Sequence, residues 1–244
     1  MESTPHRVLQ ELGPLRVADN FIGNTDIADK VKASTDFFPE AMLDDDNIGK
    51  FLNGYHTEQA SCYAPYMFWD GWWKSPADTL RKQVIQRIWE QIIPEPENNV
   101  LGFEYWVRTF MPGQFLGRHV DEDTFMYEEF KWFQGPSIGC VWYGFSESEG
   151  SYLEIHEAGI EEGPFSLDAE KTDLLSSPPA RRERIAYRPD RLIIFDAGHR
   201  LHETTEILSG VKQVMVVNVW AAETMPHALT TGQFVFESKE SSPQ

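Results

Sequence analysis

The pattern that most constrains the fold is a series of short apolar runs. It begins near residue 100, and the runs are broken by Gly, Pro and acidic residues. Short runs separated by turn-forming residues are typical of the strands of an all-β sandwich or jelly roll. We therefore expect strands at residues 102–110, 115–120, 138–145, 152–156, 191–195, 202–205 and 213–220.

The first hundred residues have a different pattern. Leu80, Val84 and Ile88 recur at helical spacing after the helix-opening segment 75–78, which predicts an amphipathic helix. A shorter capped helix is expected near Asn24. Helices that precede a run of strands indicate the α+β class, here with a jelly-roll core.

The 244 residues are expected to form one domain. We divide it into a helical support region at 1–99, a core at 100–222 and a tail at 223–244. The connection 157–190 is long for a compact domain, which predicts an insert or lid. The aromatic segment 63–73 is expected either to pack in the core or to line the mouth of a substrate site.

Charge and cysteine content limit the partners. A formal net charge of −18 would repel nucleic-acid phosphates and anionic membranes, so we expect neither as a partner. The acidity either favours a cationic substrate or serves solubility. Cys62 and Cys140 are far apart in the sequence and no stretch is apolar enough to span a membrane, so a cytoplasmic protein is expected.

Two histidines and an aspartate form a candidate metal site. His119 and Asp121 are two residues apart in an expected strand, so both side chains project from one face. The apolar run 191–195 leads to His202, which could join them. Two histidines and one carboxylate on one face of an octahedron leave adjacent positions open, as in non-heme Fe(II) oxygenases. Arg118 should face the opposite way unless a bulge intervenes.

The residues around this triplet resemble a known family. The stretch 112–121, Pro-Gly-Gln-Phe-Leu-Gly-Arg-His-Val-Asp, is similar to the metal-binding strand of the prolyl hydroxylase branch of the Fe(II)/2-oxoglutarate oxygenases. Further matches follow in the family's order at 138–143, 149–155 and 191–220, so the resemblance covers about residues 100–222. It implies a double-stranded β-helix, the jelly-roll or cupin-like fold of that family.

The resemblance also implies roles for five residues. His119, Asp121 and His202 would ligate Fe(II). Lys212, ten residues after His202, would pair with the distal carboxylate of 2-oxoglutarate, for which the collagen-type members also use lysine. Tyr143 would donate a hydrogen bond to the same carboxylate.

Each role has an ordinary alternative. His199 could replace His202 as a ligand, although only His202 has a lysine at the family's distance. His156 is expected to be a strand or surface histidine. Lys212 taken alone could be a solvated lysine, and Tyr143 could simply be a core residue.

The implied activity is an O2-dependent hydroxylation with Fe(II) as cofactor and 2-oxoglutarate as cosubstrate, and ascorbate as an optional reductant. The substrate would be a prolyl residue in a peptide or protein, or an amino-acid-like small molecule. One departure from the family pattern is Ser151, which replaces the second glycine of a Gly-Gly pair. A non-catalytic cupin-like jelly roll that binds a metal or ligand is the alternative, which Asp121 and Lys212 together disfavour.

Overall fold

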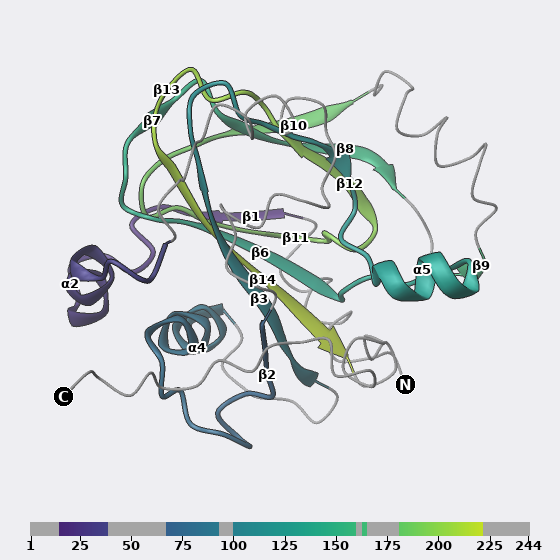
Figure 1. The fold of residues 1–244 in the computed structure, drawn as a ribbon, viewed down its shortest axis with the longest axis horizontal. Coiled ribbons are helices and arrows are strands. Elements are labelled where there is room, and N and C mark those ends of the chain that lie inside the picture. Colours follow the sequence, from purple (N-terminus) through teal and green to yellow (C-terminus); the bar gives the residue numbers. More distant parts are fainter. Residues whose placement is uncertain (1–14, 39–66, 93–99, 160–162, 165–180, 222–244) are drawn as a thin grey trace.

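The computed structural model describes residues 15–38, 67–92, 100–159, 163–164 and 181–221. Two antiparallel β-sheets face each other, and two helices cover the far side of the larger sheet (Figure 1). The larger sheet has six strands in the order β1-β11-β6-β14-β3-β2, and the smaller has four in the order β10-β8-β12-β4.

The strands of the larger sheet are β1 (Leu15–Ala18), β2 (Met67–Trp69), β3 (Val100–Phe110), β6 (Ile138–Tyr143), β11 (Leu192–Phe195) and β14 (Lys212–Ala221). Those of the smaller sheet are β4 (Leu116–His119), β8 (Tyr152–Gly159), β10 (Arg182–Ala186) and β12 (Arg200–Thr204). Two short pairs complete the strands: β7 (Ser148–Glu149) with β13 (Ser209–Gly210), and β5 (Trp132–Phe133) with β9 (Gly163–Pro164).

The order in which the chain visits the two sheets defines the fold. The successive pairs β3 and β4, β6 and β8, β10 and β11, and β12 and β14 each place one strand in either sheet. This alternation is that of a double-stranded β-helix, so the expected α+β class with a jelly-roll core is confirmed. All seven strands expected from residue 100 onward are present, with ends that differ by a few residues.

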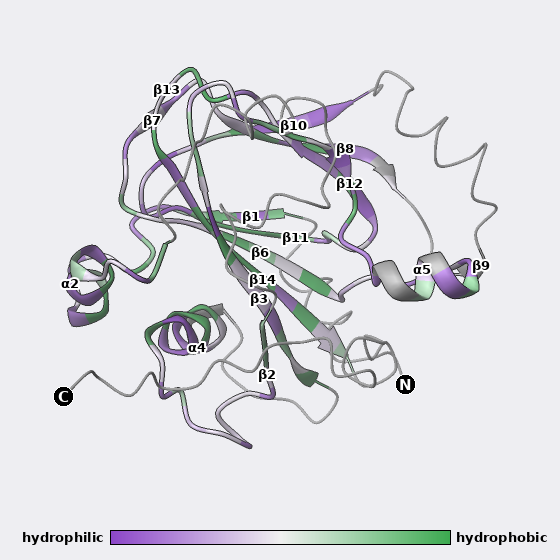
Figure 2. Ribbon diagram, in the orientation of Figure 1, coloured by the Kyte–Doolittle hydropathy of each residue, from purple (hydrophilic) through white to green (hydrophobic). Residues whose placement is uncertain are grey.

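The six-stranded sheet separates two hydrophobic cores. Alternate residues of β14 face opposite sides, so Val217 and Val219 pack on the helix side while Val214 packs between the sheets. Phe195 and Ile155 meet in the core between the sheets. Figure 2 shows β6 and β11 mostly in hydrophobic colours, as expected for strands buried on both faces, whereas β10 and β12 carry more hydrophilic residues.

The two helices α2 (Asp26–Ala33) and α4 (Leu80–Ile92) lie on the outer face of the larger sheet (Figure 1). Thr25, and not Asn24, caps α2 by accepting a hydrogen bond from the Ala28 backbone. The expected start of α4 near residue 75 is too early, since the helix begins at Leu80. No helix in the described ranges is long and apolar enough to cross a membrane.

The aromatic segment packs in the core as far as the structure describes it; residues 63–66 lie outside the described residues. The rings of Trp69, Trp72 and Trp73 surround Phe103, with centroid separations of 5.8, 6.1 and 5.8 Å. These residues belong to the core on the helix side of the larger sheet, away from the space between the sheets.

Some elements were not expected from the sequence. Within the expected insert at 157–190, β8 continues to Gly159 and β10 forms an edge strand of the smaller sheet, while 160–162 and 165–180 lie outside the described residues. Arg182 to Arg184 are exposed, and such charged edge strands lack the apolar alternation that reveals a strand. Helix α5 (Thr124–Phe130), capped by Asp123, follows β4 directly.

Candidate metal centre

A β-bulge shapes the end of β4 where the candidate ligands begin. His119 lies opposite His202 on β12, while Leu116 lies opposite Thr204, so β4 has one residue more than β12 in this interval. The extra residue is the bulge. It allows both Leu116, which packs on the core between the sheets, and His119 to face inward.

The three candidate ligands converge on one point. His119 Nε2 lies 3.6 Å from Asp121 Oδ1, and His202 Nε2 lies 3.7 Å from the same oxygen. The two imidazole centroids are 4.2 Å apart, and the three potential ligand atoms all lie within 4.8 Å of one another. One ion could therefore contact all three side chains.

Hydrogen bonds to the backbone fix the tautomer of both histidines. His119 Nδ1 lies 2.7 Å from the Gly117 carbonyl, and His202 Nδ1 lies 3.0 Å from the Arg200 carbonyl. A carbonyl can only accept, so each ring donates from Nδ1 and keeps its lone pair on Nε2. Both lone pairs are then on the atoms nearest Asp121, as a metal ligand requires.

Burial shifts the ionisation of the cluster. It lowers the pKa of His202 to about 4, because a charged imidazolium is poorly solvated there. The imidazole is therefore neutral at physiological pH, which is the form that binds metals. Burial also raises the pKa of Asp121, although His119 and a hydrogen bond from Asn218 act in the opposite direction. A bound cation would compensate for burying this carboxylate.

Asp121 is held from two further elements. Its backbone N–H donates to the Ala197 carbonyl at 2.9 Å, which ties the end of β4 to the turn after β11. The Asn218 amide of β14 donates to its carboxylate from the larger sheet. The third ligand is thus positioned by both sheets, although it lies beyond the last paired residue of β4.

A buried lysine lies deeper between the sheets. Lys212 is only 1% exposed, and its Nζ donates to Ser151 Oγ at 3.0 Å and Thr204 Oγ1 at 3.5 Å. The rings of Phe110 and Tyr143 lie nearby, with centroids 5.5 and 5.1 Å from the ammonium. Within the part of the chain that the structure describes, no carboxylate pairs with this cation.

The surroundings of Lys212 suit an anion. Burial, with a smaller contribution from the nearby Arg108, lowers the pKa of Lys212 to about 7. The Tyr143 hydroxyl is buried and has no hydrogen-bond partner among the described residues, and burial raises its pKa. A cation without a counter-ion and a hydroxyl without an acceptor therefore lie in the same core, where both are costly unless a ligand satisfies them.

Strand β12 connects the lysine to the metal ligands. His202 and Thr204 are two residues apart on one face of β12, a separation of about 7 Å along a strand. Because Lys212 Nζ contacts Thr204, the ammonium lies next to the His-Asp-His cluster along the inner face of the smaller sheet. A small molecule with two ends could contact both.

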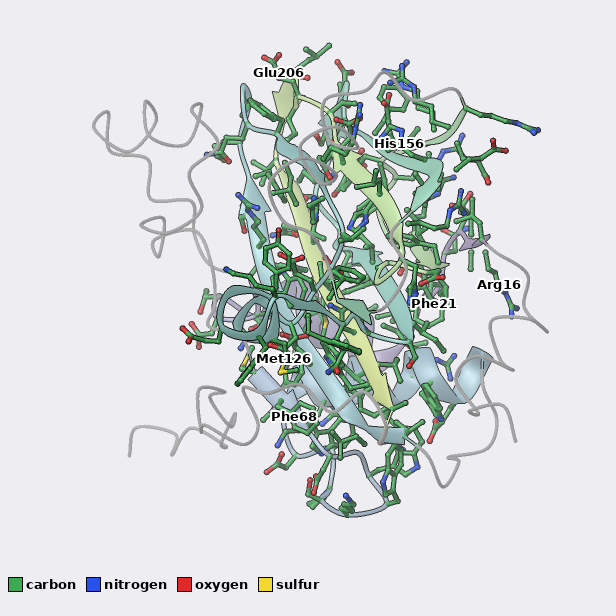
Figure 3. The ribbon with its side chains drawn as sticks, turned by 90° about the vertical axis from the view of Figure 1, so that its right-hand side faces the viewer. Arg16, Phe21, Phe68, Met126, His156 and Glu206 are labelled. Carbon is green, nitrogen blue, oxygen red and sulfur yellow. The ribbon has the colours of Figure 1, made fainter. Side chains whose placement is uncertain are left out.

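His199, His156 and Arg118 lie outside this cluster. His199 Nδ1 lies 2.8 Å from Asp196, and this histidine is not part of the convergent cluster. His156, labelled in Figure 3, is buried on the other face of the smaller sheet, where its Nε2 lies 2.9 Å from Glu203. Arg118 Nη2 lies 3.5 Å from the same carboxylate, on the face opposite His119, as strand alternation predicts.

Sequence reasoning missed four residues that contact the candidate site. Ser151 and Thr204 contact Lys212, whereas Asn218 and Glu104 lie beside Asp121. Ser151 was noted only as a departure from the glycine pair. The available signal for Asn218 and Glu104 was a polar residue inside an otherwise apolar strand, since such a residue needs a buried partner.

No protein-family model and no curated protein matches the chain. Among solved structures it is similar to a prolyl-4-hydroxylase from Pseudomonas putida, at 14% identity and a TM-score of 0.44, over 89% of this chain and 99% of that one. A 2OG-Fe(II) oxygenase family oxidoreductase from Burkholderia pseudomallei matches at 10% identity and 0.45, over 90% and 92%. A prolyl hydroxylase from Trichoplax adhaerens, in complex with a hypoxia inducible factor peptide fragment, matches at 11% and 0.45, over 90% and 94%. What this chain does has to be inferred from its own residues.

Proposed function

We propose that the protein is an Fe(II)- and 2-oxoglutarate-dependent hydroxylase. The observation that carries the proposal is the buried ammonium of Lys212, which has no carboxylate partner among the described residues and lies next to the His-Asp-His cluster. A protein that only binds a metal has no use for such a cation. A dicarboxylate cosubstrate that also reaches the metal gives it one.

The donor set fits iron. Two neutral imidazoles and one carboxylate are the ligands of the 2-His-1-carboxylate triad, which favours non-heme Fe(II). The Nδ1 hydrogen bonds of His119 and His202 place their Nε2 lone pairs on the side of Asp121, whose largely buried carboxylate supplies the negative charge. We propose these three residues as the iron ligands.

The core between the sheets fits one carboxylate of 2-oxoglutarate. Lys212 would supply the charge and Tyr143 a hydrogen bond from its unpartnered hydroxyl. Ser151 and Thr204, which now accept from Lys212, hold the ammonium in place. The other end of the cosubstrate would be directed along β12 toward the metal ligands.

When bound, iron and 2-oxoglutarate would supply the oxidation of a C–H bond by O2, with succinate and CO2 as co-products. The residues of the chain bind and orient these groups. The apolar residues Phe110, Ile155 and Phe195 border the site and keep water from it. An amino-acid-like molecule or a prolyl residue in a peptide would be the substrate.

Succinate formation tests the proposal. Purified protein with Fe(II), 2-oxoglutarate and ascorbate should form succinate in air and not under anaerobic conditions, with more formed when a substrate is present. A well-folded protein that forms no O2-dependent succinate, and whose melting temperature does not respond to 2-oxoglutarate, would instead be the non-catalytic metal-binding jelly roll.

A further inference from the structure

A second carboxylate lies beside Asp121 on the inner face of the larger sheet. Glu104 of β3 and Asn218 of β14 are direct cross-strand partners. The Asn218 amide donates to the carboxylates of both Glu104 and Asp121, and Trp220 Nε1 donates to Glu104 Oε2 at 2.9 Å. The Asn218 amide lies between the two carboxylates. Glu104 is therefore held close to the metal ligand.

The two carboxylates determine how the Asn218 amide is oriented. Ionised carboxylates only accept hydrogen bonds, so the NH2 group must face them and Oδ1 must face elsewhere. Asn218 is 2% exposed, and in the described part of the chain its Oδ1 has no hydrogen-bond partner. A buried acceptor in this state is free to take a hydrogen bond from a donor on a bound ligand.

Glu104 also has acceptor capacity to spare. A carboxylate has about four lone-pair sites, and Trp220 and Asn218 provide two donors. The carboxylates of Asp121 and Asp123 also lie near enough to add negative charge around Glu104. The group that best complements this pair of acceptors is a cation with several N–H donors.

Phe68 and Trp220 keep the carboxylate in position. The two rings pack together with Leu101, and both are almost fully buried. Phe68 lies at the opposite end of the molecule from Glu206 (Figure 3). Because the indole that donates to Glu104 is itself fixed, the carboxylate would be presented to a ligand with little loss of side-chain freedom.

We propose that Glu104 and Asn218 select a substrate that carries a protonated amine or guanidinium close to the carbon that is hydroxylated. The proposal rests on the proposed function and narrows its substrate class. The ring of a prolyl residue in a peptide has no N–H donor for these acceptors, so a basic side chain is favoured over proline. The net charge of −18 would also attract a cation.

Matched pairs of compounds test this inference. N-acetyl-L-arginine amide is compared with N-acetyl-L-citrulline amide, which has the same shape without the charge, and N-acetyl-L-lysine amide with N-acetyl-L-norleucine amide. Peptides acetylated and amidated at their ends, with arginine, citrulline or proline at the centre, extend the panel. Binding is measured by calorimetry on protein loaded with Zn(II) and 2-oxoglutarate, and hydroxylation by mass spectrometry on protein loaded with Fe(II). Each cation should exceed its neutral partner by about ten- to a hundredfold.

Variants assign that preference to Glu104. Glu104→Gln keeps the shape and removes the charge, so the ratio of cation to neutral partner should fall at least tenfold. Glu104→Asp keeps the charge and should retain part of the preference. Glu90→Gln is the matched control, because it removes one exposed negative charge on α4 and should leave the ratio unchanged. Melting temperature and Zn(II) affinity report whether each variant is folded.

Three results would overturn the inference: neutral partners bound as well as cations, proline peptides preferred over arginine peptides, or an unchanged ratio in a folded Glu104→Gln protein. None of them depends on hydroxylation. Failure of the proposed function is a separate result, recognised by the absence of O2-dependent succinate and of any response to 2-oxoglutarate.

Discussion

Replacing Lys212 with methionine should stabilise the empty protein and prevent it from binding 2-oxoglutarate, the proposed cosubstrate. The ammonium is 1% exposed, its hydrogen-bond partners are the Ser151 and Thr204 hydroxyls, and two aromatic rings and the positive charge of Arg108 lie nearby. Methionine has a similar volume and carries no charge, so it suits an apolar core. A residue retained for binding is expected to cost stability in this way.

The magnitude follows from the pKa of Lys212, which burial lowers from 10.5 to about 7. At about 1.4 kcal/mol for each factor of ten in the protonation equilibrium, the charged form costs about 5 kcal/mol in the folded state. Losing the hydrogen bonds to Ser151 and Thr204 offsets about 2 kcal/mol of this. Lys212→Met should therefore raise the free energy of unfolding by about 3 kcal/mol, or the melting temperature by about 5 to 10 °C.

The pH dependence provides an internal check. A base whose pKa is lower in the folded state binds fewer protons there than in the unfolded state between pH 7 and 10.5. Stability of the wild type relative to Lys212→Met should then rise with pH across this window, and the gap should narrow. Below pH 7 both states are protonated and the gap should stay constant.

Urea unfolding in the presence of EDTA, with and without 2-oxoglutarate, measures these quantities. The wild type should be stabilised by the cosubstrate once metal is restored, and Lys212→Met should not respond. A variant that is equally or less stable than the wild type without ligands, with m-values unchanged, would refute the reasoning that Lys212 is an uncompensated cation. An equal response to 2-oxoglutarate would remove the lysine from the site.

Three further predictions concern the same site. Above pH 7 the Lys212 amine of the ligand-free protein becomes neutral, so calorimetry on Zn(II)-loaded protein should show 2-oxoglutarate affinity falling about tenfold per pH unit up to about pH 9. The Lys212→Arg protein stays charged and should lose this pH dependence. A parallel decline in both proteins would contradict the assignment of the pH dependence to Lys212. Tyr143→Phe should weaken 2-oxoglutarate binding about tenfold without changing Zn(II) affinity, because only the unpartnered hydroxyl is removed. Asp121→Ala should abolish hydroxylation and weaken metal binding by at least tenfold in calorimetric titrations, and full activity in that variant would exclude Asp121 as a ligand.

The parts of the fold that the sequence predicts are those set by periodicity. Strands β3, β6 and β14 lie inside the larger sheet, so burial forces their residues to be apolar and the runs are visible. Strand β10 was missed because it is an edge strand with a charged surface, and its pairing with β8 depends on residues distant in sequence.

The candidate ligands were predictable for a related reason. His119 and Asp121 are close in sequence, so their placement depends mainly on local geometry, and His202 follows a recognisable strand. The bulge in β4 could not be predicted, since it depends on how β4 pairs with β12. Glu104 and Asn218 were not identified because they are distant from Asp121 in the sequence. They come near it only because β3 and β14 pair in the larger sheet and face the end of β4.

Three ionisable groups between the two sheets share one physical property. Burial disfavours the charge of Asp121, Lys212 and Glu104, and the described residues offer each of them hydrogen bonds but only weak charge compensation. Each has a different natural complement, namely a divalent cation, a carboxylate and a basic substrate group. A chain selected for stability alone would replace such groups with apolar residues, as is often possible for buried charges. Their coexistence between the two sheets is best explained by three ligands that bind side by side, and this favours the proposed catalytic centre over a simple metal-binding site.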